Sequence, residues 1–129
     1  MSVDEQHFSV KATDGYIHLR TWGALDAKNL DAPANAALAL AKEKNINKLL
    51  DDIRDVDTSA VSIPIQAKAM GILWKLRTFD KIAIVLKGSR VRSLFFSTLE
   101  ILHLNIDAKF KGFDNESEAI AWLKNDGNE

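Results

Sequence analysis

The sequence predicts an α/β fold: a single mixed β-sheet of five strands combined with four helices. Two observations carry this prediction. The alternating segment from Phe8 to Trp22 is interrupted by Asp14-Gly15, a dipeptide typical of tight β-hairpins. After this hairpin, strand-like and helix-like segments alternate strictly to the end of the chain. That order is typical of parallel strands joined by helical crossovers.

Composition limits the class of protein. The chain has 129 residues, of which 47% are hydrophobic, so we expect one domain over residues 1–129. Its 17 Lys and Arg against 18 Asp and Glu disfavour a nucleic-acid binder. The absence of cysteine excludes disulfides, thiolate chemistry and cysteine zinc sites. We find neither a membrane-span run nor a signal peptide, and therefore expect a soluble cytoplasmic protein.

The first elements are two antiparallel strands and a helix. Alternation predicts strands over Phe8–Thr13 and Tyr16–Trp22. The second strand places on one face the side chains of Tyr16, His18, Arg20 and Trp22. A helix is expected within Asp26–Asn45, since Pro33 suits a first turn and Asn45 a stop. Its small-residue stripe, suited to close packing on a sheet, comprises Ala34, Ala37, Leu38 and Ala41.

The segment from Asp57 to Asp80 predicts a helix with two apolar sides, following a third strand over Ile46–Ile53. The side expected to face the core comprises Val61, Ile65, Ala69, Ile72, Leu76 and Phe79. The opposite side comprises Ile63, Ala67, Met70 and Trp74. A surface helix needs only one apolar side. The second side therefore requires either a neighbouring helix of the same domain or a pocket, another subunit or a membrane.

The remaining elements complete the alternation. Lys81–Lys87 is a short apolar run, which indicates a buried parallel strand. A third helix is expected over Arg90–Asn105, a last strand over Ala108–Phe113 and a last helix over Glu116–Asn125. Asn115 with Glu118 has the spacing of a capping box at the start of that helix.

Several stretches resemble the SpoIIAA-like family. They are KLLDDIRDVD on the third strand, KIAIVLKGS on the fourth, and FDNESEAIAWLK at the end of the chain. The family shares its fold with STAS domains and is similar to lipid-binding CRAL-TRIO domains. The resemblance implies a small, non-enzymatic module, with hydrophobic-ligand binding and membrane association as suggested roles.

A narrower resemblance concerns Asp57-Thr58-Ser59-Ala60. Bacterial anti-sigma-factor antagonists carry an Asp-Ser-Ser-Gly-like turn at this strand-to-helix junction, and a partner kinase phosphorylates the second serine. The resemblance implies Ser59 as the phosphorylation site, although Thr58 and Ala60 depart from the pattern. The alternative interpretation, which we favour from the residues alone, is that Asp57, Thr58 or Ser59 simply caps the helix.

Acidic residues gather near the end of the third strand: Asp51, Asp52, Asp55 and Asp57. Asp55-Val56-Asp57 resembles the Asp-x-Asp of magnesium-dependent phosphotransferases, but that motif should directly follow an apolar strand. We favour a solvated strand end with Arg54 as the local counter-charge. Asp51 and Asp52 point to opposite faces of the strand, so at least one of them is expected to be partly buried.

No catalytic constellation is predicted. The three histidines lie on separate elements without metal-type spacing. The sequence has neither a nucleophile elbow nor a glycine-rich phosphate loop. We therefore expect no catalytic residue, metal site or cofactor.

These observations favour a module that binds a hydrophobic small molecule or a membrane surface. The binding face is expected on the second helix, which acts as a lid, and comprises Ile63, Ala67, Met70 and Trp74. Phe96 of the third helix is expected to be an interfacial anchor. One alternative is a switch that binds a regulatory protein and is controlled by phosphorylation of Ser59. Another is a homodimer that uses the same apolar face.

Overall fold

The computed structural model describes residues 8–24, 31–57, 68, 71–72, 75–87 and 110–125. In these residues five strands form one sheet in the order β1-β2-β3-β4-β5. The first pair is antiparallel and the other three pairs are parallel, which confirms an α/β fold with a single mixed five-stranded sheet. The strands are β1 (Phe8–Thr13), β2 (Tyr16–Ala24), β3 (Lys48–Asp57), β4 (Lys81–Val85) and β5 (Phe110–Phe113).

The hairpin between β1 and β2 follows the prediction from Asp14-Gly15. Both residues have positive φ, 49° for Asp14 and 86° for Gly15. A two-residue loop with two positive φ angles is a type I′ turn, whose twist matches that of the strands it joins. The turn pairs Thr13 with Tyr16 and so sets the register of the whole hairpin.

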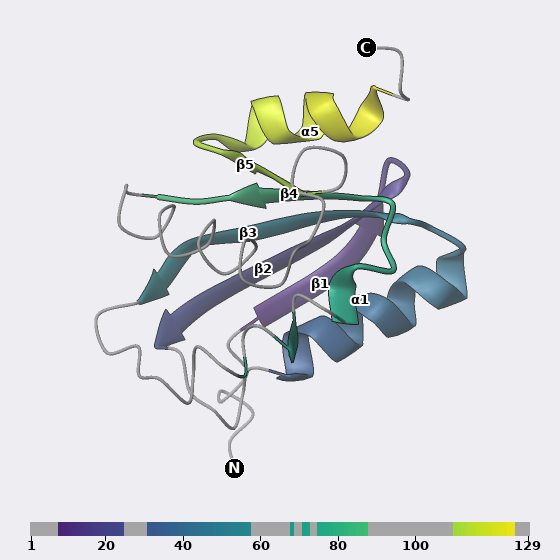
Figure 1. Cartoon of the computed structure of the whole chain (residues 1–129), viewed down its shortest axis with the longest axis horizontal. Helices are drawn as coiled ribbons and strands as arrows, with labels where there is room; N and C mark the ends of the chain where they lie inside the picture. The colour runs from purple at the N-terminus through teal and green to yellow at the C-terminus, as the bar shows by residue number, and fades with distance from the viewer. Residues whose placement is uncertain are drawn as a thin grey trace.

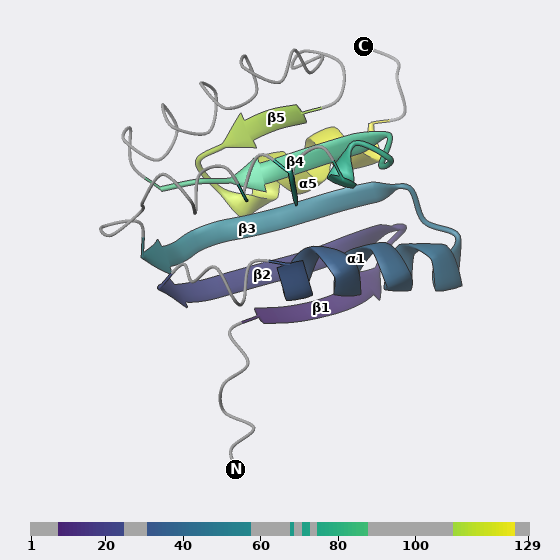
Figure 2. The same ribbon diagram turned by 60° about the horizontal axis from the view of Figure 1, so that its bottom comes forward.

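Two helices lie on opposite sides of the sheet, α1 (Asp31–Lys44) and α5 (Glu116–Lys124) (Figure 1). Turning the molecule brings α1 in front of β1 and β2 and leaves α5 behind β4 (Figure 2). Asn115 caps α5, since its side-chain oxygen accepts a hydrogen bond from the Glu118 backbone N–H at 2.9 Å. Among the described residues no helix is long and apolar enough to cross a membrane.

The core has two parts, one on each side of the sheet. On the side of α1, small residues of that helix pack against larger side chains of the strands. On the side of α5, Ala119 and Leu123 pack against Leu50, Ala83 and Val85. Consecutive residues of β4 therefore enter different parts of the core, which explains its continuous apolar sequence.

The described residues contain two helices rather than the four expected. Residues 68, 71–72 and 75–76 are also helical, within the segment expected to form the second helix. There Leu76 and Phe79 are buried and Ile72 packs on the same core, as expected for the core-facing side. The third expected helix, residues 90–105, lies outside the described residues.

The predicted boundary between the third strand and the second helix is wrong. Strand β3 continues to Asp57, where a helix was expected to begin. The reason is pairing: Trp22, Gly23 and Ala24 of β2 hold residues 55–57 in the ladder. Asp57 therefore belongs to strand β3.

Candidate functional site

A β-bulge shapes the second half of β3. Arg20 of β2 pairs with Asp52, whereas Trp22, two residues later, pairs with Asp55, three residues later. The strand β3 therefore holds one extra residue here, which bends it and re-aims its side chains. The bulge places Asp55 opposite Trp22, on the same face as Arg20, while Asp52 and Arg54 interact with groups on the α5 side of the sheet.

The centre of the site is an ion pair between the buried carboxylate of Asp52 and the partly exposed side chain of Arg54. The Asp52 side chain is 1% exposed. Arg54 Nε donates to its Oδ1 at 2.9 Å and Arg54 Nη2 donates to its Oδ2 at 2.6 Å. The Arg54 backbone N–H donates to the same Oδ1 at 3.1 Å. Arg54 thus binds both carboxylate oxygens, an arrangement that gives both strength and orientation.

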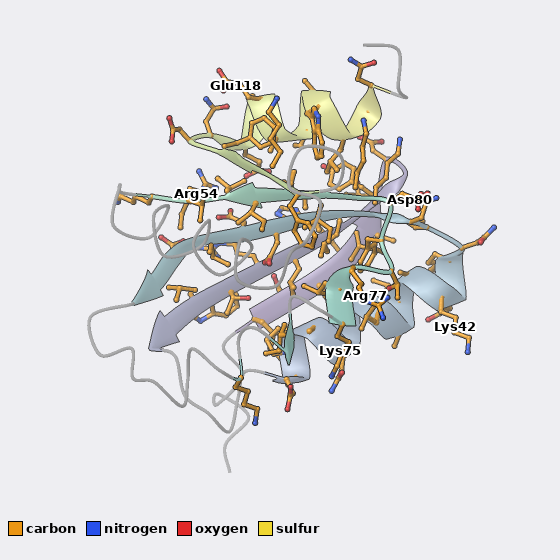
Figure 3. All side chains as sticks on the ribbon, in the orientation of Figure 1. Lys42, Arg54, Lys75, Arg77, Asp80 and Glu118 are labelled. Atoms are coloured by element: carbon orange, nitrogen blue, oxygen red, sulfur yellow. The ribbon has the colours of Figure 1, made fainter. Side chains whose placement is uncertain are left out.

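The same guanidinium reaches the last helix. Arg54 Nη2 also donates to Oε1 of Glu116, the first residue of α5, at 3.2 Å. Figure 3 shows Arg54 on the side of the sheet that carries α5, whereas Lys75 and Arg77 lie on the α1 side. Arg54 therefore links the middle strand of the sheet to α5.

Arg54 keeps the buried carboxyl of Asp52 ionised. Burial by itself would raise the pKa of Asp52, but the hydrogen bonds and charge of Arg54, helped by the charge of Arg20, outweigh it. The pKa of Asp52 is consequently below its usual range. A carboxyl with a lowered pKa stabilises the fold above its unfolded pKa, and this contribution is lost as pH falls through the folded pKa.

A second ion pair lies at the surface beside the first. Arg20 binds Asp55, and both side chains are about half exposed (46% and 51%). The Arg20 guanidinium also lies 5.2 Å from the centroid of the Trp22 ring, within cation–π range. Arg20 and Trp22 thus share one face of β2, as the alternation predicted.

The other face of β3 carries an unusual carboxyl. Asp51 lies in the ladder between Leu19 and Ile84, two buried residues of the α1-side core. Burial, and then the charge of Asp52, raise the pKa of Asp51 to about 7. Adjacent aspartates therefore behave in opposite ways, because only Asp52 has an arginine.

The structure describes the acidic residues of β3 but not the residues predicted to bind a ligand or membrane or to be phosphorylated. The strand end was expected to be solvated, with at least one of Asp51 and Asp52 partly buried. Asp55 is half exposed and Asp52 is fully buried, which agrees with that expectation. Arg54 is the local counter-charge as expected. Outside the described residues lie all the predicted ligand, membrane and phosphorylation positions: Ser59, Ile63, Ala67, Met70, Trp74 and Phe96.

Sequence reasoning missed the contribution of Glu116 and His18 to this site. The side chain of His18 lies on the α5 face of β2, with Asp52 and Glu116 nearby. Glu116 was predicted only as the first residue of a helix. An acidic residue in the first turn of a helix is common because it stabilises the helix by itself. The sequence therefore did not indicate that Glu116 contacts Arg54.

By these features the protein is a small α/β module. It has a five-stranded mixed sheet and a polar cluster where β2 and β3 meet the last helix. The SpoIIAA-like family model matches residues 16–124, and the chain belongs to the SpoIIAA-like family. A search of curated proteins found no match.

Two solved structures share the fold. An anti-sigma factor antagonist from Mycobacterium paratuberculosis is 17% identical and aligns over 90% of this chain and 92% of its own, with a TM-score of 0.62. An uncharacterised protein with a SpoIIAA-like fold from Shewanella loihica PV-4 is also 17% identical. It aligns over 90% of this chain and 91% of its own, with a TM-score of 0.58.

Replacing Arg54 with methionine should strongly destabilise the protein. The change leaves the Asp52 carboxylate buried and unpaired, which we expect to cost about 3 kcal/mol in the free energy of unfolding. Arg20→Met is the matched control and should cost at most about 1 kcal/mol, since its partner Asp55 is exposed. Urea denaturation at pH 7 measures both values. Equal losses of unfolding free energy in the two variants would contradict the claim that the buried Asp52 carboxylate depends on Arg54.

Replacing Asp51 with asparagine should stabilise the protein at high pH. Because the folded pKa of about 7 exceeds the unfolded value, the folded state binds more protons between about pH 4 and pH 7. Stability therefore falls as pH rises through that window, and Asp51→Asn should gain up to about 4 kcal/mol at pH 8. The gain should vanish near pH 4. Asp55→Asn should show no such gain, and a pH-independent effect of Asp51→Asn would refute this assignment.

Proposed function

We propose that this protein is a non-enzymatic regulatory module that acts by binding another protein, in the manner of an anti-sigma-factor antagonist. The observation that carries the proposal is its membership of the SpoIIAA-like family. The fold shared with an anti-sigma factor antagonist over nine-tenths of the chain supports the same class of partner. The sequence alone ranked this function second, behind binding of a hydrophobic ligand.

The position of Ser59 supports this function. Strand β3 runs to Asp57, so Thr58-Ser59 directly follows the carboxyl end of a central strand. The carboxyl ends of strands are where α/β folds place their functional residues. Phosphorylation would add about two negative charges close in sequence to Asp55 and would change how this end of the sheet meets a partner.

The described acidic residues favour a non-enzymatic role. The Asp-x-Asp motif of magnesium-dependent phosphotransferases directly follows an apolar strand. Here Asp55 lies inside strand β3 and is paired with Arg20. The Asp-x-Asp interpretation of residues 55–57 therefore has little support.

Incubation with an anti-sigma-type serine kinase of the source organism and ATP should place one phosphate per chain on Ser59, as read by mass spectrometry. Ser59→Ala should abolish the modification, and the matched variant Thr58→Ala should retain it. Binding of the kinase by Ser59→Asp should be at least about tenfold weaker, since a charge mimics the phosphorylated state. A stable protein that neither binds such a kinase nor accepts phosphate would refute the proposal.

We also propose a second function, binding of a hydrophobic molecule or a membrane surface through Ile63, Ala67, Met70 and Trp74, with Phe96 as an interfacial anchor. One observation favours it. Leu76 and Phe79, at the end of the same segment, are buried on the core-facing side, whereas Lys75 and Arg77 are exposed. The core therefore takes the side of Leu76 and Phe79, and we assign the opposite side, which includes Met70, to a ligand, a membrane or a second copy of the chain.

Met70→Lys separates these uses. If this side meets a ligand or membrane, the variant should stay folded, within about 0.5 kcal/mol of wild type, and lose the change in Trp fluorescence that liposomes or a fatty acid produce. If it is a dimer face, the variant should sediment as a monomer. Thr78→Lys, at an exposed position of the same segment, serves as the control. A loss of several kcal/mol would instead mean that Met70 is ordinary core and would contradict this function.

A further inference from the structure

We propose that His18, Asp52 and Glu116 form a binding site for a divalent transition-metal ion of the zinc class. Each residue offers one ligand atom, and these three atoms lie within 4.8 Å of one another. The residues come from β2, β3 and the first turn of α5, so the fold and not a local motif brings them together.

His18 supplies the observation that points to a ligand. Its imidazole Nε2 is buried and has no hydrogen-bond partner within the described part of the chain. A buried polar atom without a partner is costly, and native structures rarely leave one without a reason. The neighbouring groups on this face include two carboxylates, Arg54 and the Tyr16 ring, whose centroid lies 6.4 Å from that of the His18 ring. An imidazole nitrogen together with carboxylate oxygens is a donor set that suits a metal ion.

The geometry is compatible with zinc after small movements. Zinc binds imidazole nitrogen and carboxylate oxygen at about 2.0–2.2 Å, so tetrahedral ligands lie roughly 3.3 Å apart. The present separations of up to 4.8 Å need to shorten by about 1.5 Å. Glu116 can supply much of this by side-chain rotation, since its side chain is 38% exposed. One nitrogen and two oxygens favour zinc, cobalt or manganese over magnesium, which prefers oxygen ligands alone.

Arg54 is the competitor for this site. It binds Asp52 and Glu116 at once, so the two carboxylates and the guanidinium together carry a net charge of −1. A metal ion has to displace the guanidinium from both carboxylates. A displaced Arg54, whose side chain is already 34% exposed, can turn toward solvent.

The competition has a structural consequence. Without metal, Arg54 links β3 to α5 through Glu116. With metal, His18 of β2 takes over that role, because the ion joins β2, β3 and α5 directly. The metal ion and the Arg54 guanidinium therefore cannot bind Asp52 and Glu116 at the same time, and only one of them links α5 to the sheet through these carboxylates. Metal supply would then change how α5 is attached to the sheet.

The test is a titration of the full chain with zinc chloride, followed by calorimetry and by long-range ¹H–¹⁵N spectra of the histidine rings. We expect one saturable site in the micromolar range, with a shift of the His18 ring nitrogens and not those of His7 or His103. Magnesium at the same concentration should cause no shift. The wild-type spectrum alone decides the assignment, whether or not any variant folds.

Variants sharpen the result. His18→Gln and Glu116→Gln should each weaken zinc binding by at least about tenfold. Glu118→Gln, an exposed glutamate in the same first turn, is the matched control and should leave it unchanged. Arg54→Gln should strengthen binding by about tenfold, because the competing cation is gone. No saturable binding below about 1 mM zinc, or equal affinity in His18→Gln and wild type, would overturn the proposal.

Discussion

The ionised carboxylate of Asp52 lies buried in the middle strand of the sheet, and Arg54 is what makes this possible. A buried carboxylate without a partner would either destabilise the fold or become protonated. Arg54 binds both of its oxygens, and the same guanidinium then reaches Glu116. The bulge in β3 follows Asp52 and brings Asp55 opposite Trp22, where Asp55 pairs with Arg20. Arg54 thus links the middle strand of the sheet to the last helix.

The two sides of the sheet use different chemistry. On the α1 side, alanines of the helix and large side chains of the strands form an apolar core, with Asp51 at its margin. On the α5 side, a smaller apolar core gives way to the polar group of His18, Asp52, Arg54 and Glu116. The adjacent residues Asp51 and Asp52 show the contrast, because their pKa values shift in opposite directions. Any change at the polar group acts on α5, since α5 packs on β3, β4 and β5.

Local sequence signals predicted much of this fold. Asp14-Gly15 set the hairpin, Asn115 marked the start of α5, and the apolar run of β4 indicated burial on both sides. The end of β3 could not be predicted in this way, because residues 55–57 are held by pairing with a distant strand. The polar residues of β3 suggested a largely solvated strand end. Their pattern could not show that Arg54 binds the buried carboxylate of Asp52. The meeting of His18 with Glu116 depends on strand register and helix packing, which are properties of the whole fold and not of spacing along the chain.

The most direct measurement of this account is a double-mutant cycle on Asp52 and Arg54, with unfolding free energies determined for Asp52→Asn, Arg54→Met and the combined variant. If the arginine is present chiefly to compensate a buried charge, the combined variant should be more stable than Arg54→Met alone. The interaction free energy should then be at least about 2 kcal/mol. Additive losses, with an interaction free energy near zero, would contradict the claim that this pair organises the α5 side of the sheet.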